Sequence, residues 1–576
     1  MPLAALAVAI VQGLLLWSLV AAGEAGRWPA TDPRVMLPLA LLALALPLTL
    51  QLLWPFARQR LLQVALAGAA LTVIACGAAF AAKHLAGPPA ADDGDIVAGF
   101  VLPLGIAWLL ALPLLKLRLS TGRWTGPFPA LFDITWRGAL TLAEAALFTG
   151  VFWALLGLAA ALFGLLGIAA VGDVITDPRF AIPATAVVGS AAIQLIGASA
   201  GMVDGLLRQL LSLLKWLLPL AGLIAVAFTL AMIPRLPALF AEGRKVMDAT
   251  WLLWLVALTV LLLNAAYQTG QQPPGYGRHL ERALRFVPPL LVVVAATALY
   301  SLALRTGAYG LTPARYWGIV TALAALAYAA GYSLAAWSDG PWFGKLGRVN
   351  IVVALALLAV LLTSLTPLAD PLRLSIASQT RRALGAPDGS LRDGALRFLG
   401  REAGAAGRER LEALARQPDA AGGSAALRAA AARARLPVDP KDGRFEDWLA
   451  RIDWRAAGGT PDQRLTAALR GIFVADDPRS ARLDRAAMLR VDADGDGRLD
   501  ALLLQTDGGA PNPFWLFTQD DAGGWTLRAT GDAIGRAPEA EMEAALRDGD
   551  FTAVTPLLQG LRIGKSRLTL LPDGPR

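Results

Sequence analysis

Cysteine, histidine and charge are all scarce in this chain of 576 residues. Cys76 is the single cysteine, so no intrachain disulfide can form, and its apolar neighbours predict a small buried packing residue. The two histidines, His84 and His279, fall in predicted loops and argue against a histidine-ligated metal centre. Charged residues make up 17% of the chain, whereas soluble domains carry about 25%. The chain is therefore not an average soluble protein.

Long apolar runs are what the sequence has in abundance, and they fill its first two thirds. A helix needs about 20 apolar residues to cross the hydrocarbon core of a bilayer. We therefore predict a mainly α fold, with a polytopic transmembrane domain of about eleven helices over residues 1–368. The first run has no basic start, so we expect a retained span rather than a signal peptide. The predicted spans are 2–20, 36–56, 61–82, 96–115, 140–170, 182–203, 213–233, 249–267, 286–304, 316–336 and 349–368.

The basic residues between the spans indicate an orientation. If the N-terminus is cytoplasmic, the inner loops hold thirteen Lys and Arg residues and the outer loops nine, in keeping with the positive-inside rule. Eleven spans then place the rest of the chain outside, which is the periplasm for a multi-pass protein of a bacterial inner (cytoplasmic) membrane. Because these loops touch lipid headgroups, the net charge of +8 predicts the lipid bilayer as the partner and not nucleic acid.

The polar tail divides into two regions. Residues 369–438 predict a helical connector rich in Ala and Arg, with segments such as AGGSAALRAAAARARL. From residue 439 to residue 576, β-type apolar runs alternate with Asp/Gly turns, which predicts a smaller soluble α+β domain. We expect the tryptophans of this domain to lie in its core; they are Trp448, Trp454, Trp515 and Trp525.

Several segments combine polar, aromatic and helix-breaking residues in a recognisable way. They are LLLNAAYQTG (261–270), ALYSLALRTGAYGLTPARYWGI (298–319), Asn350, PLADPLRLSIASQTRRAL (367–384), LRDGALRFLGREAGAAGRERLEAL (391–414) and the span region 136–168. Together they resemble the bacterial membrane-protein family filed as domain of unknown function 4153, over roughly residues 130–415, with YGLTPAR as the most specific segment. The resemblance implies no established activity and supplies no catalytic residues.

The stretch VDADGDGRLDALLL (491–504) has the spacing of a calcium loop. Calcium takes six to eight oxygens at flexible distances. The twelfth position, where an EF-hand needs Glu, is a leucine, and the flanking residues predict strands. We expect a β-loop-β calcium loop with a structural role, and the alternative is a metal-free Asp/Gly hairpin. The candidate ligands at positions 1, 3, 5, 7 and 9 are Asp492, Asp494, Asp496, the carbonyl of Arg498, and Asp500.

Few polar residues within or beside the spans stand out. Glu144 is a functional candidate because an intramembrane carboxylate is costly, and the alternative is a structural contact near the interface. Gln194 and Asn264 are candidates for lining a cavity, or else for joining helices by hydrogen bonds. Arg305 and Arg315 flank a polar loop beside a helix start, which favours an anion or headgroup contact, or a plain connector with interfacial anchors.

The motifs that the sequence lacks limit its function. No G-x-x-x-x-G-K-[ST] phosphate loop and no H-E-x-x-H occur, so ATP hydrolysis and zinc-protease chemistry are not expected. We favour a non-enzymatic cell-envelope protein that presents a periplasmic domain for binding, sensing or assembly, with an envelope protein as partner. The alternatives are a transporter or flippase of a small or lipid-linked molecule, and a membrane enzyme acting on a lipid-linked substrate.

Overall fold

The chain forms two compact units in a computed structural model, Met1–Arg435 and Leu436–Arg576. The structure describes 3–85, 93–124, 126–235, 249–270, 275–337, 343–385, 389–416, 425–434, 445, 448–449, 452–454, 463–472, 486–493, 497–505, 512–519, 523–533, 561–563 and 566–568.

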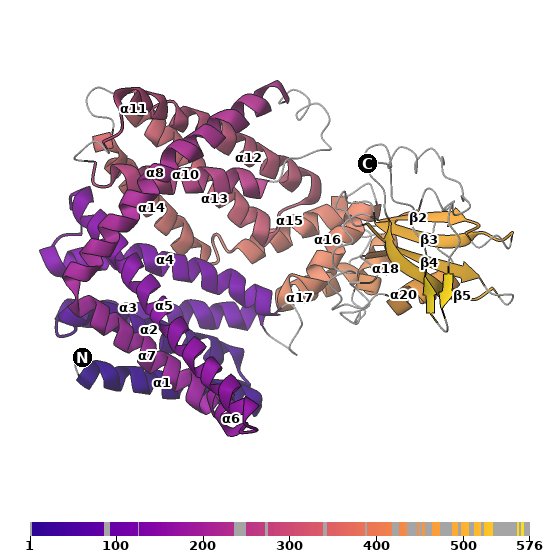
Figure 1. Ribbon diagram of the computed structural model, residues 1–576, viewed down its shortest axis with the longest axis horizontal. Helices are drawn as coiled ribbons and strands as arrows, with labels where there is room; N and C mark the ends of the chain where they lie inside the picture. Colours follow the sequence, from indigo (N-terminus) through magenta and orange to yellow (C-terminus); the bar gives the residue numbers. More distant parts are fainter. Residues whose placement is uncertain are drawn as a thin grey trace. The chain divides into compact units, whose positions relative to one another are not determined.

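Unit 1 is a helical bundle whose long helices run side by side (Figure 1). Eleven helices among its described residues are long and apolar enough to cross a membrane, which confirms the predicted number and the mainly α class. The eleven are α1 (Leu3–Glu24), α2 (Pro33–Leu52), α3 (Arg60–His84), α4 (Asp93–Thr121), α5 (Phe128–Leu165), α7 (Pro178–Ala198), α8 (Ala200–Met232), α10 (Ala249–Tyr267), α12 (Val287–Tyr309), α13 (Pro313–Ala336) and α14 (Phe343–Ser364). Shorter helices are η1 (Trp54–Phe56), α6 (Ala170–Thr176), η2 (Ile233–Arg235) and α11 (Arg278–Leu284).

The helices extend beyond the apolar runs at several ends. Helix α5 begins at Phe128, well before the predicted 140, because Asp133 and Arg137 form an i,i+4 salt bridge that suits a helix. The two histidines were predicted in loops, and that prediction is wrong. His84 is the last residue of α3, where its ring packs on Phe80, and His279 lies in α11.

Small residues let the spans approach closely. A Cβ atom on Gly13 of α1 would lie 2.5 Å from Pro183 Cα of α7, and one on Gly331 of α13 would lie 2.6 Å from a Val349 methyl of α14. Between apolar helices in lipid, this van der Waals fit is a main source of association. Helix α1 is thus an integral part of the bundle.

Four further helices complete unit 1, and we call them the cap: α15 (Pro371–Gly385), α16 (Gly389–Arg401), α17 (Gly404–Ala415) and α18 (Ala425–Ala434). Their apolar faces share one core with the ends of α3 and α4, in which Phe398 and Leu399 of the cap pack with Ala81, Ile96 and Phe100. We call the end of the bundle that carries these helices the cap end. It is where α3, α12 and α14 finish and where α4 and α13 begin.

Unit 2 contains a five-stranded sheet in the order β1-β2-β3-β4-β5, of which Figure 1 labels β2 to β5. Strand β1 pairs parallel with β2 and the other pairs are antiparallel. All four predicted core tryptophans lie in or against the core that the sheet and α20 enclose. The elements are β1 (Ile452–Asp453), α20 (Gln463–Ile472), β2 (Ala486–Val491), β3 (Asp500–Gln505), β4 (Asn512–Gln519) and β5 (Trp525–Ala533), with a separate pair β6 (Leu561–Ile563) and β7 (Ser566–Leu568).

Candidate functional site

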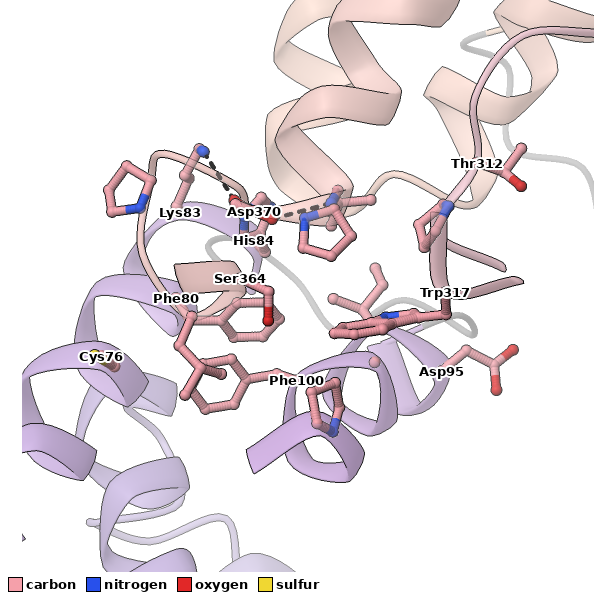
Figure 2. Close-up of a pocket in the computed structure, with 18 of the residues that line it drawn as sticks. Cys76, Phe80, Lys83, His84, Asp95, Phe100, Thr312, Trp317, Ser364 and Asp370 are labelled. Carbon is pink, nitrogen blue, oxygen red and sulfur yellow. Dashed lines mark hydrogen bonds and ion pairs between the residues drawn. The ribbon is translucent and has the colours of Figure 1, made fainter. Parts of the chain in front are cut away.

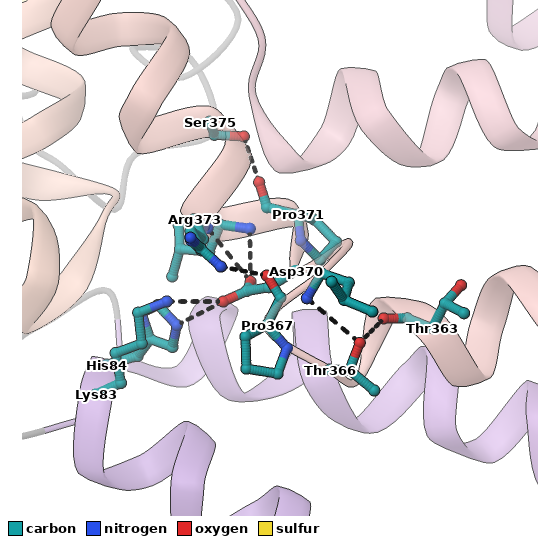
Figure 3. Close-up of polar contacts among 11 residues, drawn as sticks. Lys83, His84, Thr363, Thr366, Pro367, Asp370, Pro371, Arg373 and Ser375 are labelled. Carbon is teal, nitrogen blue, oxygen red and sulfur yellow. Dashed lines mark hydrogen bonds and ion pairs between the residues drawn. The ribbon is translucent and has the colours of Figure 1, made fainter.

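Asp370 joins the bundle to the cap. It follows α14 and caps the start of α15, where one carboxylate oxygen, Oδ1, accepts hydrogen bonds from the backbone N–H groups of Leu372 (3.0 Å) and Arg373 (3.3 Å). The other, Oδ2, contacts His84 Nε2 at 3.1 Å and Lys83 Nζ at 3.2 Å. Figure 3 shows Lys83 and His84 reaching Asp370 from α3. One side chain thus holds two bundle residues and the first turn of the cap.

The electrostatics of this cluster keep Asp370 ionised. Burial raises the pKa of the carboxyl group. The hydrogen bond and electrostatic contact with His84, the charge of Lys83 and the Arg373 N–H outweigh burial and lower the pKa to about 2. An ionised carboxylate can only accept hydrogen bonds, so His84 donates through Nε2–H.

His84 is enclosed on all sides. Its side chain is 1% exposed, its ring lies 4.9 Å from that of Phe80, and Phe80 stacks on Phe100 at 4.5 Å. The Nδ1 atom is buried and has no hydrogen-bond partner among the residues that the structure describes. The backbone of Gly404 in α17 covers the His84 carbonyl so closely that a Cβ atom would lie 2.6 Å from it. Cap and bundle therefore meet directly at this histidine.

A pocket of about 290 Å³ opens beside this cluster, between the cap and the ends of α3, α4, α13 and α14. Figure 2 shows Phe80 and Phe100 on one side of it and Trp317 on the other. Its volume is at the low end of the range of about 300–1,000 Å³ for small-molecule sites. Charged and aromatic side chains share the lining, which suits a small polar ligand or headgroup. The lining contains the charged residues Lys83, Asp95, Asp370 and Glu402, together with His84.

The cap also forms hydrogen bonds with the end of α12 and the loop between α12 and α13. Gln379 of α15 donates to the carbonyls of Tyr309 (3.1 Å) and Leu311 (3.0 Å), and Arg382 donates to the carbonyls of Gly307 and Ala308. These contacts satisfy carbonyls at the C-terminal end of α12, where positive charge is favoured. The predicted Arg315 donates to the carbonyls of Tyr309 and Gly310 in the same loop. Anion binding by Arg305 and Arg315 stays a prediction.

Asn264 takes part in a closed ring of hydrogen bonds inside the bundle. Its Nδ2 donates to the Tyr332 hydroxyl (2.8 Å), that hydroxyl donates to Asn350 Oδ1, and Asn350 Nδ2 donates to Asn264 Oδ1 (2.6 Å). The ring joins α10, α13 and α14, and Asn264 and Asn350 also line a cavity of about 410 Å³. Hydrogen bonds of this kind fasten helices to one another in lipid.

Gln194 lies in a second polar contact, with Gln51 of α2. Its Nε2 donates to the Gln51 carbonyl (3.0 Å) and side-chain oxygen (2.8 Å), while Gln51 Nε2 donates to the Ala5 carbonyl (2.8 Å). Glu144 lies in α5, half-buried, and its Oε1 is buried without a hydrogen-bond partner in the described part of the chain. Among the described residues no hydrogen bond links Glu144, Gln194 and Asn264, so they do not form one site.

The predicted calcium loop connects β2 and β3, which pair from Val491 with Asp500 onward. The strand flanks are therefore confirmed. Asp492 Oδ2 accepts from the Gly497 N–H (3.0 Å), and the buried Asp500 accepts through Oδ2 from the Ala493 N–H (3.0 Å). These bonds are those of a self-supporting Asp/Gly turn. Arg498 is exposed, and the candidate ligands Asp494 and Asp496 lie outside the described residues. Calcium stays a prediction.

The chain also contains one pattern that is typical of a catalytic serine. GASAG (197–201) matches G-x-S-x-G, the elbow that carries a nucleophilic serine in α/β-hydrolases. That elbow requires a strand followed by a helix, whereas Ser199 separates helices α7 and α8. Its hydroxyl donates to the Leu195 carbonyl at 3.2 Å. The match has no hydrolase context.

The described residues define a multi-pass helical membrane protein with a cap and a second unit. Comparison of the chain with models of protein families, with curated proteins and with solved structures gave no match. The sequence did not reveal the cap-end cluster because Lys83, His84 and Asp370 belong to no recognisable motif. One signal was available, since Asp370 before Pro371 and Leu372 is a helix N-cap pattern.

Proposed function

We propose that this chain is a non-enzymatic protein of the bacterial cell envelope, and that the cap-end pocket is its working site. In this proposal a small polar ligand or headgroup binds in the pocket, and the cap transmits its presence to unit 2, which follows the cap in the chain. A binding, sensing or assembly role with an envelope protein partner fits this arrangement.

One observation carries the proposal: Asp370 lines the pocket and at the same time begins the cap. A ligand that changes the contacts of Asp370 with Lys83 or His84 therefore changes the bonds that hold α15. A ligand shifts an equilibrium only through contacts that differ between two states. Asp370 lines the pocket and caps α15, so its contacts are those that a ligand would have to alter.

We further propose that the cap end faces the periplasm. The loop counts of thirteen against nine support a cytoplasmic N-terminus. Helix α15 lies close to the end of the last span and adds three basic residues on the outer side, Arg373, Arg381 and Arg382. With them, the count of basic residues becomes thirteen inside against twelve outside. A reporter fused at Arg576 tests the orientation: activity of a periplasm-specific reporter agrees with the proposal, and activity of a cytoplasm-specific reporter contradicts it.

A transporter or flippase is the second candidate, and two cavities in the bundle favour it. Their volumes are about 720 and 410 Å³, and both are lined by α4 and α5. They share five lining residues, which are Leu109, Leu110, Pro113, Thr135 and Ala139. The Gln194 contact lines the larger cavity and the Asn264 ring lines the smaller one.

Full-length variants in cells that lack the wild-type gene distinguish the two candidates. Trp317→Ala opens the cap-end pocket without removing a bond of Asp370, and Gln194→Ala alters the larger cavity. The readouts are envelope integrity under detergent stress and protein level in the membrane. The proposal expects Trp317→Ala cells to match deletion cells and Gln194→Ala cells to match wild type. The opposite pattern at equal protein levels contradicts it and favours transport.

A further inference from the structure

The larger cavity is a groove between α2, α4, α5 and α7, and we call it the leaflet groove. Along α4 its lining runs from Ile106 to Lys116. Ten positions of helix correspond to about 15 Å, which is half of the roughly 30 Å hydrocarbon core. Ile106 stands near the middle of α4, and Lys116 near its end. The groove thus has the depth of one bilayer leaflet, on the side where the N-terminus lies.

The walls of the leaflet groove are mostly apolar, although Thr135 and Thr141 also line them. Gln51 and Gln194 line it, but their amides bond to each other. Lys116 is the charged lining residue, and it forms no ion pair with a residue that the structure describes. Arg137 is paired with both Asp133 of its own helix and Asp204 of α8. Asp133 acts on Lys116 electrostatically but forms no ion pair with it, so among the described residues no carboxylate contacts this half-buried lysine at the shallow end of the groove.

The position of Lys116 matches the level of the lipid headgroups. Trp54 follows α2 and lines the same end of the groove. Tryptophan and lysine are typical of the membrane interface, and basic residues between helices there bind anionic headgroups. The volume of about 720 Å³ is within the range for small-molecule sites.

We propose that the leaflet groove binds an anionic phospholipid, with one acyl chain along α4 and the phosphate at Lys116. The acyl chain packs along the apolar wall, because inside a bilayer the groove would otherwise stay unfilled. Lys116 receives the phosphate because it is the charged residue among those that line the groove. This site is separate from the cap-end pocket and does not depend on the function proposed for it.

Full-length protein, stripped of native lipid in detergent micelles, is the sample for the test. Native mass spectrometry measures the binding of phosphatidylglycerol and of phosphatidylcholine with the same acyl chains. One lysine near the headgroups is worth about a fivefold difference in affinity. We therefore expect phosphatidylglycerol to bind about fivefold more tightly to wild type, and Lys116→Gln to abolish that preference. Arg123→Gln, which removes an exposed charge beyond the same end of α4, is expected to keep it.

A second pair of variants tests the acyl chain. Gly138 lines the groove and has no atom within 4 Å of an added Cβ, so Gly138→Phe fills the groove without a backbone clash. Gly150 of the same helix is equally open but lies outside the groove lining. Gly138→Phe is expected to weaken binding of both lipids, and Gly150→Phe to leave it unchanged. The proposal is overturned if Lys116→Gln keeps the phosphatidylglycerol preference, or if Gly138→Phe binds lipid like wild type.

Discussion

His84 Nε2 and Asp370 Oδ2 lie 3.1 Å apart although 286 positions separate the two residues in the chain. His84 ends the third span, and Asp370 starts the cap after the last one. The contact therefore joins the end of the third span to the start of the cap, at the cap end of the bundle. This polar contact is one of those that hold the cap against the bundle.

Asp370→Asn is expected to weaken the link between cap and bundle. Asparagine caps helices about as well as aspartate, so the first turn of α15 keeps its acceptor, whereas the charge is lost and an NH2 group replaces the oxygen that accepts from His84 and Lys83. From the lowered pKa of Asp370 we expect a loss of about 2 kcal/mol at neutral pH. Thermal unfolding in detergent measures the change, and Asp393→Asn, an exposed residue of α16, is the control.

The difference between wild type and Asp370→Asn is expected to depend on pH. The pKa of Asp370 is about 2 in the folded protein and near 4 in an unfolded chain. A lowered pKa adds stability that is fully present above about pH 4 and is lost as the pH falls toward 2. The two melting temperatures should therefore converge across that window. A difference that stayed constant down to pH 2 would rule out this role for the charge.

Gly404→Ala is expected to loosen α17 from the bundle. The residue has φ of +62°, and a Cβ atom would lie 2.6 Å from the His84 carbonyl oxygen. Backbone strain and the clash together should cost about 1–3 kcal/mol. Hydrogen exchange of α17 in the full-length protein should rise. Gly394→Ala is the matched control, because it lies in helix α16 with open space around its Cβ, and it should be neutral or slightly stabilising.

Tyr332→Phe is expected to break the hydrogen-bond ring inside the bundle. It deprives Asn264 Nδ2 of an acceptor and Asn350 Oδ1 of a donor, at an expected cost of about 1–3 kcal/mol. Tyr328→Phe, which removes a hydroxyl from the same helix, is the control. The aromatic side chain of Tyr328 packs against Tyr332, but Tyr328 takes no part in the hydrogen-bond ring. Unfolding in detergent should separate the two variants. Equal losses would show that the ring adds nothing beyond packing.

Calcium binding by the loop after β2 is expected to stabilise unit 2. Titration of the full-length protein with Ca²⁺ should raise the melting transition of unit 2, since a ligand that binds only the folded state stabilises it. Asp494→Asn and Asp496→Asn should reduce the shift. If the melting temperature of unit 2 does not change with millimolar Ca²⁺, the loop is a metal-free Asp/Gly hairpin. The hydrogen bonds of Asp492 and Asp500 then account for its conformation.

Much of the fold was predictable because hydropathy and turn chemistry act over short stretches of chain. Eleven spans follow from eleven apolar runs, and the β2–β3 hairpin follows from alternating Asp and Gly between apolar flanks. The helix ends were less predictable. Helix α5 continues through Asp133 and Arg137, where the salt bridge of the two side chains replaces apolar periodicity.

The candidate sites required the tertiary structure. Nothing local marks His84 as the partner of Asp370, because a lone histidine at the end of a span has no periodic signal. Gln194 and Asn264 were identifiable as polar residues in apolar runs, yet their separate partners, Gln51 and Tyr332, depend on which spans pack together. The sequence by itself determined a membrane bundle with a polar tail. Only the packing of small residues and buried polar groups decided which side chains meet, since those contacts join segments far apart in the chain.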